Sequence, residues 1–461
     1  MPTTLHLALD PRGSRRRALE AALRTAIRDG RLVAGTRLPS TRTLATDLGI
    51  ARGTVVESYV QLRAEGYLAA RTGAGTWVAA IAAPPPAAAP SPARQRPPRF
   101  SFHPGLPDLT AFPHAAWAAS LRRGLRKAPA ASLGYGDPRG RRALREALAA
   151  YLGRTRGVVA DPELVVVCAG FRHGLSMLAR ALRAQGAERI AMEDPCLWLH
   201  RDVARGAGLE VAPVPVDERG ARTELLVETA AAAAVLGPAH QFPLGCVLRP
   251  ERRAAAVAWA RASGGFVIED DYDAELRYDR QPVGALQALD PEHVVYAGTA
   301  SKTLAPGLRL GWLVLPRALL EPVVALRRVE DVHVPAPEQI AFTELLVSGT
   351  FERHVRRVRA RYRTRRDRLV ALLASRALPV TPVGISAGLR VLLELPPDGP
   401  SGEELAALGA RRSIELFPVG PSYRDGQPAR DGVVVGYGGL PEHDFDAGLA
   451  ALGDLLAAAL G

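Results

Sequence analysis

The chain has few cysteines, no long apolar run and no apolar leader, and each shortage excludes a class of protein. Its three cysteines, Cys168, Cys196 and Cys246, are widely spaced, so they form neither a disulfide framework nor a metal-ligand pattern. The most apolar run, residues 230–236, is far too short to span a bilayer. The first twenty residues are charged and lack the apolar core of a secretion signal. We therefore expect a protein of the reducing cytoplasm, with no metal and no membrane partner.

The chain is rich instead in hydrophobic residues and in arginine. Its 461 residues are too many for one ordinary domain and indicate two or three. A hydrophobic content of 48% supports a large buried core and excludes a disordered protein. Lys and Arg outnumber Asp and Glu by 59 to 47, a formal net charge of +12, which favours a polyanionic partner. Genomic bias is the alternative origin of such an arginine-rich, lysine-poor composition.

Residues 81–99 mark a domain boundary. This stretch, IAAPPPAAAPSPARQRPPR, contains seven prolines, which exclude a helix or a central strand and favour an extended spacer. The expected organisation is therefore an N-terminal domain at residues 1–80, a linker at 81–99 and a large domain at 100–461.

The N-terminal domain is predicted to contain three helices and a hairpin. Apolar residues at 19, 22, 23, 26 and 27 mark one helical face, which stops at residues 29–30. Ser40 is a good N-cap for a second helix, which runs to Leu48 and is closed by Gly49. A third helix is expected at 52–65, and residues 67–71 and 76–79 flank a glycine-containing turn. This order predicts a winged helix-turn-helix.

The stretch GTRLPSTRTLATDLGIARGTVVESYVQLRAEGYLAARTGAGT, residues 35–76, resembles the GntR family of bacterial regulators. The resemblance implies that the third helix enters the major groove of double-stranded DNA. Arg52 can read guanine edges, and hydroxyls or backbone amides can contact phosphate. The alternative for any single Arg is a solvated surface residue. The resemblance assigns DNA contact to Arg42, Arg52 and Thr54, and to Thr72 and Gly73 at the tip of the wing.

Beyond the linker, strand-like and helix-like stretches alternate, which predicts an α/β domain with a mainly parallel sheet. The short apolar runs 164–167, 189–192, 232–236 and 265–268 each end in a turn. In such folds ligands gather at the carboxyl ends of the strands. Another strand is expected at 292–298, directly before the segment SKTLAPGLRLGW at 301–312. The residues that follow these strands are therefore the candidate site.

Lys302 is the centre of that candidate site. A partly desolvated lysine with Arg309 nearby can lose its proton and form a Schiff base with an aldehyde, and the pattern suggests pyridoxal phosphate (PLP). Asp270 can pair with a pyridine nitrogen and Tyr272 with the phenolic oxygen of the ring, while Arg309 suits a phosphate. Taken alone, the spacing of Ser301, Lys302 and Arg309 is a weak signal, and an ordinary surface lysine in a loop is the alternative.

The phosphate has a second predicted binding element. Gly170 lies at a strand-to-helix turn, where it exposes the backbone amides of Phe171 and Arg172 at a helix N-terminus. Anions bind readily at such a terminus.

The order of these motifs resembles fold-type I PLP enzymes of the aminotransferase class, which have a small C-terminal α+β domain. The whole chain resembles the MocR subgroup of GntR regulators, in which such a domain is fused to the winged helix. The resemblance implies PLP as cofactor, Lys302 as its Schiff-base lysine, Asp270 and Tyr272 as ring partners, Arg309 as a phosphate ligand, and Thr299 and Ser301 as further phosphate ligands. It also implies a homodimer. The segments that carry it are YGDPRG (135–140), HQFPLG (240–245), IEDDYD (268–273), residues 298–312 and the basic helix 353–359.

Three positions depart from the pattern of active aminotransferases. Leu197 stands where relatives have an aromatic residue over the ring, although Trp198 is adjacent. Phe242 replaces an asparagine that bonds the ring oxygen, and Val434 stands where an arginine clamps the substrate carboxylate. Transamination needs the substrate held in one orientation by such a clamp. We therefore expect coenzyme capture rather than enzymatic turnover.

The leading hypothesis is a PLP-responsive transcriptional regulator, which senses PLP alone or PLP joined to a small amine. The ligand must bind one arrangement of the protein better than another to act as a signal. The missing clamp favours PLP itself, as in regulators of vitamin B6 synthesis, while GABA, taurine and D-alanine derivatives stay open. An active aminotransferase with a DNA-binding domain and a DNA-binding protein with a dimerisation scaffold are the alternatives. The basic helix 353–368 is either a second DNA site or a solvated helix face.

Overall fold

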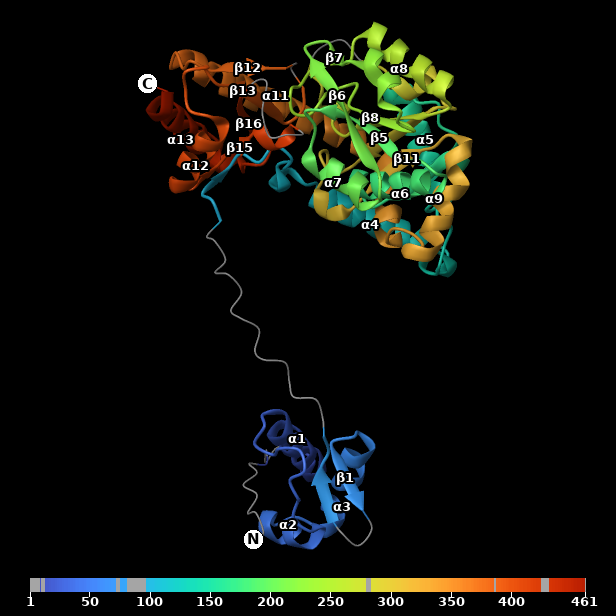
Figure 1. The fold of residues 1–461 in the computed structure, drawn as a ribbon, viewed down its shortest axis with the longest axis vertical. Coiled ribbons are helices and arrows are strands. Elements are labelled where there is room, and N and C mark those ends of the chain that lie inside the picture. The colour runs from blue at the N-terminus through green and yellow to red at the C-terminus, as the bar shows by residue number, and fades with distance from the viewer. Residues whose placement is uncertain are drawn as a thin grey trace. The chain divides into compact units, whose positions relative to one another are not determined.

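The computed structural model describes residues 9, 13–71, 75–80, 97–278, 283–384, 387–423 and 431–460. The chain divides into two compact units, Met1–Arg96 and Pro97–Gly461 (Figure 1). Each unit has a hydrophobic core of its own, and each is described by itself.

The first unit is a winged helix-turn-helix, as predicted. Ser40 Oγ accepts a hydrogen bond from the Thr43 backbone N–H at 3.1 Å, and Gly49 ends the same helix at φ 61°. Leu19, Leu44 and other apolar side chains form the core. The wing strands are antiparallel, and the proposed wing-tip residues Thr72 and Gly73 lie outside the described residues. The elements are α1 (Arg15–Arg28), α2 (Thr41–Leu48), α3 (Arg52–Ala64), β1 (Leu68–Arg71) and β2 (Gly75–Val78).

The second unit is built on an eight-stranded sheet in the order β4-β11-β10-β9-β8-β5-β6-β7. Strands β10, β9, β8, β5 and β6 are parallel, which confirms the mainly parallel sheet. Strand β11 is antiparallel to both of its neighbours. A parallel strand would need a connection long enough to return to the opposite end of β10, and residues 300–310 are too few for such a crossover. The strands are β4 (Val165–Cys168), β5 (Arg189–Asp194), β6 (Glu210–Asp217), β7 (Gly220–Ala221), β8 (Ala233–Leu236), β9 (Phe266–Asp271), β10 (Val294–Thr299) and β11 (Gly311–Val314).

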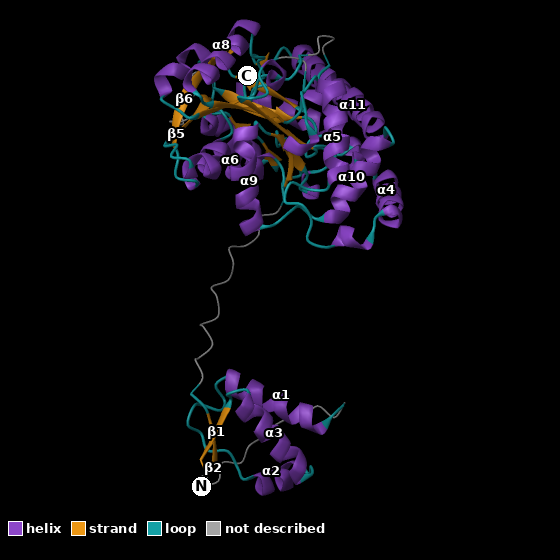
Figure 2. Ribbon diagram, turned by 90° about the vertical axis from the view of Figure 1, so that its right-hand side faces the viewer, coloured by secondary structure: helices purple, strands orange, loops and turns teal. Residues whose placement is uncertain are grey.

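Helices cover both faces of this sheet (Figure 2). In β4, Val166 packs with Leu178 of α6, while its neighbour Val167 packs with Leu148 of α5 on the opposite face. Successive residues of a strand point to opposite faces, so a sheet covered on both sides needs the continuous apolar run found here. The helices are α4 (His114–Lys127), α5 (Arg142–Arg156), α6 (Phe171–Ala184), α7 (Trp198–Gly206), α8 (Pro250–Ser263), α9 (Arg317–Glu330) and α10 (Ala336–Val347).

The C-terminal part forms the expected small α+β layer. Its four-stranded antiparallel sheet has the order β12-β13-β16-β15, and Leu392 of β13 lies opposite Val434 of β16. A separate parallel pair joins β3 to β14. The elements are β3 (Phe100–Ser101), α11 (Thr350–Ser375), β12 (Thr381–Val383), β13 (Arg390–Glu394), α12 (Gly402–Arg411), β14 (Ile414–Glu415), β15 (Phe417–Pro418), β16 (Gly432–Gly436) and α13 (Glu442–Leu460).

The three cysteines lie in the interior of the second unit. Cys168, Cys196 and Cys246 are all buried, and all three thiols are free. Within the described ranges, no helix combines the length and the apolar character needed to cross a membrane.

Candidate coenzyme site and DNA-binding surface

One cavity at the carboxyl edge of the large sheet contains all the residues predicted for the coenzyme site. It encloses about 1180 Å³ of space, including its open mouth. The predicted residues that line it are Gly170, Phe171, Arg172, Asp270, Tyr272, Thr299, Ser301, Lys302 and Arg309. Tertiary folding adds further lining residues from distant parts of the chain: His103, Trp198, His200, Phe242, Arg390 and Phe417.

Lys302 brings its amine into this cavity from the loop after β10. Its Nζ donates a hydrogen bond to the Gly105 carbonyl at 2.7 Å. Burial lowers the pKa of this amine to about 8; Asp273 and Asp270 oppose that shift and Arg390 adds to it. The amine is therefore in part neutral near physiological pH, as a nucleophilic lysine must be.

Asp270 brings an unsatisfied carboxylate to the same cavity. Its Oδ1 is buried and has no hydrogen-bond partner. Burial, followed by the nearby carboxylates of Asp271 and Glu193, raises the pKa of Asp270 well above its ordinary value. A buried acceptor without a partner is destabilising, so the arrangement favours a ligand that brings a proton to this oxygen. Strand β9 runs through Asp271, so Asp270 lies inside the strand rather than just past its end, as the sequence had suggested.

Tyr272 is held by hydrogen bonds on two sides. Its hydroxyl donates to the His240 carbonyl at 2.7 Å and accepts from Arg390 Nη2 at 2.6 Å. Burial raises the pKa of Tyr272 well above its ordinary value, so the phenol stays protonated. Arg390 was not predicted, because a single arginine at the start of a strand has no local signature.

The opposite side of the cavity is an anion-binding arrangement. Gly170 precedes α6 at φ 88°, and a Cβ placed on it would lie 3.6 Å from Arg309 Nη1. The guanidinium of Arg309 therefore stands beside the helix N-terminus. Thr299 Oγ1 lies 2.8 Å from Ser301 Oγ at the end of β10. Helix amides, hydroxyls and a guanidinium together suit a phosphate group.

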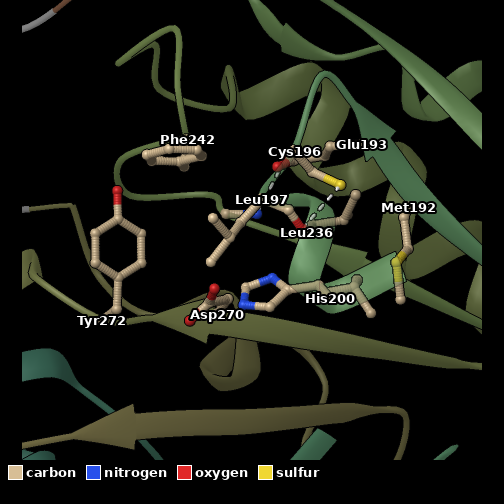
Figure 3. A pocket seen from close by; sticks show the side chains of 11 residues that line it. Met192, Glu193, Cys196, Leu197, His200, Leu236, Phe242, Asp270 and Tyr272 are labelled. Carbon is tan, nitrogen blue, oxygen red and sulfur yellow. Dashed lines mark hydrogen bonds between the residues drawn. The ribbon is translucent and has the colours of Figure 1, made fainter. Parts of the chain in front are cut away.

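The residues around the proposed position of the PLP ring differ from the pattern of active aminotransferases, in which an aromatic residue lies over the ring. Figure 3 shows Leu197 and His200 gathered beside Asp270, with Phe242 and Tyr272 close to them. Burial lowers the pKa of His200 to about 3, with Arg172 adding to the shift, so its ring is neutral. Trp198 stacks on Phe417 at 5.2 Å between ring centroids.

Val434 does not take part in the cavity wall. It is fully buried in an apolar cluster with Leu244, Leu392, Val419 and other side chains. The position that the sequence indicated for a carboxylate clamp is therefore part of a hydrophobic core.

The first unit presents its predicted DNA-facing residues on two helices. Arg42 is exposed on α2, Arg52 is exposed as the first residue of α3, and Thr54 is half-buried two residues further on. The sequence did not single out Val56 and Val60, which are 39% and 58% exposed on α3. Exposed methyl groups on such a helix suit contact with thymine methyls.

Both units match known families. Residues 15–78 match the model for bacterial regulatory proteins of the gntR family, and residues 106–407 match aminotransferase class I and II. The probable rhizopine catabolism regulatory protein MocR of Rhizobium meliloti is 33% identical over 95% of this chain and 92% of its own. The HTH-type pyridoxine biosynthesis transcriptional regulator PdxR of Corynebacterium glutamicum is 34% identical over 95% and 94%.

Solved aminotransferases share the fold of the second unit. An archaeal alanine:glyoxylate aminotransferase superposes with a TM-score of 0.71 at 27% identity, covering 78% of this chain and 91% of its own. LysN, the alpha-aminoadipate aminotransferase of Thermus thermophilus, was solved with N-(5'-phosphopyridoxyl)-L-leucine. It superposes with a TM-score of 0.68 at 26% identity, covering 78% and 92%.

Fold and site together define an aminotransferase-type domain joined to a DNA-binding winged helix. The cofactor that this fold implies is PLP, and the cavity fits it, because Asp270 Oδ1 lacks a partner and the α6 N-terminus faces Arg309. The chain belongs to the MocR subgroup of the GntR family of helix-turn-helix transcriptional regulators.

Proposed function

We propose that this protein is a transcriptional regulator whose DNA binding responds to PLP held at Lys302. The observation that carries the proposal is one cavity that combines a lysine amine of pKa about 8 with the unpaired carboxylate of Asp270. The same chain presents an exposed helix α3 of a winged helix-turn-helix. A coenzyme site and a DNA-binding surface in one protein suit a sensor.

Within this proposal each residue has a role toward PLP. Lys302 supplies the amine that captures the aldehyde, and Asp270 holds the proton of the pyridine nitrogen. Tyr272 donates to the ring oxygen once its hydroxyl proton turns away from the His240 carbonyl. The amides of Phe171 and Arg172 at the α6 N-terminus hold the phosphate together with Arg309, Thr299 and Ser301. Bound PLP supplies an electron-withdrawing ring and an aldehyde that exchanges amines.

Sensing is proposed in place of turnover because two groups expected of an aminotransferase are absent from their positions. Phe242 offers no hydrogen bond to the ring oxygen, and Val434 is buried in an apolar cluster. The curated relatives described above are named as regulators, which supports the same choice. Orienting the reacting bond contributes several kcal/mol to catalysis, and neither position 242 nor position 434 supplies the group that orients it in an aminotransferase, which disfavours efficient transamination.

The proposed organisation is a DNA-binding domain at residues 1–80, a linker at 81–99 and an effector domain at 100–461, acting in the cytoplasm as a homodimer. Leu133 and Tyr135 support the dimer, since they are 65% and 93% exposed and neighbouring exposed apolar side chains suit burial by a second copy. Two winged helices per dimer would read paired half-sites. Size-exclusion chromatography with light scattering tests this, and a monomer at micromolar concentration would contradict it.

The chain offers a clean test of PLP sensing because it contains only two lysines, Lys127 and Lys302. Fluorescence anisotropy should follow binding to the DNA upstream of this protein's own gene and its neighbour, with and without PLP. PLP should change the affinity of the wild type and of Lys127→Ala, and should leave Lys302→Ala unchanged. Equal affinity with and without PLP in the wild type would overturn the proposal.

Arg42, Arg52, Thr54, Thr72 and Gly73 are the residues that we propose to contact DNA. Phosphate contacts by arginine make binding weaken with salt, and removing one should reduce the slope of log affinity against log salt by about 1. Anisotropy titrations of Arg42→Ala at several salt concentrations measure that slope.

A further inference from the structure

Arg390 places a cationic group in the cavity on the side away from the proposed phosphate site. Among the described residues three arginines line the cavity: Arg172, Arg309 and Arg390. Gly170, beside Arg309, follows edge strand β4, whereas Arg390 contacts Tyr272 after β9 and Gln241 after β8. Strand β10, which leads to Lys302, lies between these two groups of strands. A ligand amine at Lys302 therefore has a phosphate site on one side and Arg390 on the other.

The guanidinium of Arg390 is fixed in place but retains unused hydrogen-bond donors. Nη2 donates to Tyr272 Oη at 2.6 Å and to the Gln241 carbonyl at 3.2 Å. Nε is buried without a partner. Nη1 lies 3.6 Å from Asp273 Oδ2, too far for a direct hydrogen bond, and that oxygen already bonds His240 Nδ1 at 2.8 Å. A guanidinium has five N–H donors, so this one is not saturated.

Two aromatic rings orient the same guanidinium. Arg390 Cζ lies 4.6 Å from the centroid of Phe242 and 5.2 Å from that of Tyr272. Cation–π contacts of this kind fix a guanidinium plane without using its donors. Phe242 therefore helps to orient Arg390, at a position where the sequence indicated only the absence of an asparagine.

Arg390 lies on β13, which pairs with β16, the strand in which Val434 stands in place of the arginine that clamps a substrate carboxylate. Leu392 pairs with the buried Val434, and Arg390 pairs with Gly436, two residues further along β16. The side chain of Arg390 lines the cavity, while Val434 is sealed in the core. The small domain thus brings an arginine to the site from β13.

We propose that Arg390 is the anion subsite of the cavity and that the amine effector carries a carboxylate. This inference rests on the proposed function, since it assumes PLP at Lys302, and it narrows the effector to an amino acid. A carboxylate beside Arg390 takes up the unused donors, whereas a simple amine leaves them as they are.

The test compares matched amines on the full-length, PLP-loaded protein. Absorbance titrations would give dissociation constants for L-alanine against ethylamine and for γ-aminobutyrate against propylamine, at equal concentrations of unprotonated amine. At least one carboxylate-bearing member should bind about 10- to 100-fold more tightly than its partner. A wild type that binds the members of both pairs equally overturns the proposal.

Two variants separate recognition from positioning. Arg390→Gln should bring the ratio of the two dissociation constants in a pair close to one. Arg390→Lys keeps the charge but loses the forked donors, so it should lower that ratio at least about threefold. Arg390→Lys is the second variant if Arg390→Gln fails to hold PLP. Tyr272→Phe removes the hydroxyl that Arg390 contacts, and should weaken both members of a pair together without changing their ratio. An unchanged carboxylate preference in the Arg390 variants, or a carboxylate preference lost as fully in Tyr272→Phe as in Arg390→Gln, overturns the proposal.

These titrations contain no DNA, so their failure is distinguishable from failure of the proposed function. A wild type whose DNA affinity responds to PLP, but whose amine binding shows no carboxylate preference, retains the regulator proposal and loses this one.

Discussion

The lowered pKa of Lys302 predicts how fast the protein captures PLP at different pH values. With a pKa of about 8, about a quarter of the amine is neutral at pH 7.5, against about one part in a thousand for an ordinary lysine of pKa about 10.4. The neutral amine is the nucleophile, so the capture rate must rise with pH and level off above the pKa of the amine.

The assay is stopped-flow absorbance of PLP mixed with the PLP-free protein from pH 6.5 to 9.5. A short peptide with one lysine is measured in the same buffers, because PLP itself titrates and the ratio of the two rates removes that effect. The protein-to-peptide ratio should be constant below about pH 7 and fall about 30-fold by pH 9.5, since the peptide rate still climbs while that of Lys302 has levelled off.

Lys127 provides the matched control for this experiment. It is an exposed lysine paired with Glu344 at 3.0 Å, so Lys127→Ala should give the wild-type profile. Lys302→Ala should capture PLP no faster than the peptide does, because only the exposed Lys127 remains. A ratio that stays constant to pH 9.5 would refute the reasoning, because it would mean that Lys302 titrates like a lysine in water.

Three further predictions concern single positions. Arg52→Ala should weaken DNA binding by about 1–3 kcal/mol and relax specificity at one base pair, measured by anisotropy on a set of operator variants; a uniform loss over all sequences would contradict base reading. Ser40→Ala removes the cap bonded to Thr43 and should destabilise the winged helix by about 1 kcal/mol in calorimetry. Gly170→Ala forces a side chain at φ 88° and should cost about 1–3 kcal/mol and lower the PLP content; unchanged values would refute the strained turn.

Elements with local signatures could be predicted from the sequence. Ser40 and Gly49 bound α2 as expected, because capping and positive φ depend on neighbouring residues. The run 265–268 was identified as a strand, but its end was placed too early, because the polar residues Glu269, Asp270 and Asp271 continue the ladder beside β10. Ladder pairing is a tertiary contact that composition does not report.

The sequence by itself determined the two-part organisation, the family and the set of residues around Lys302. Each of these features depends on residues close together in the chain, whose spacing matches a strand, a turn or a helix cap. Only the tertiary structure decided what faces those residues. Arg390, His200 and Phe417 enter the cavity from segments far apart in the chain, and Val434 is turned into an apolar cluster. The physical reason is that burial, lost hydrogen-bond partners and shifted pKa values depend on long-range packing.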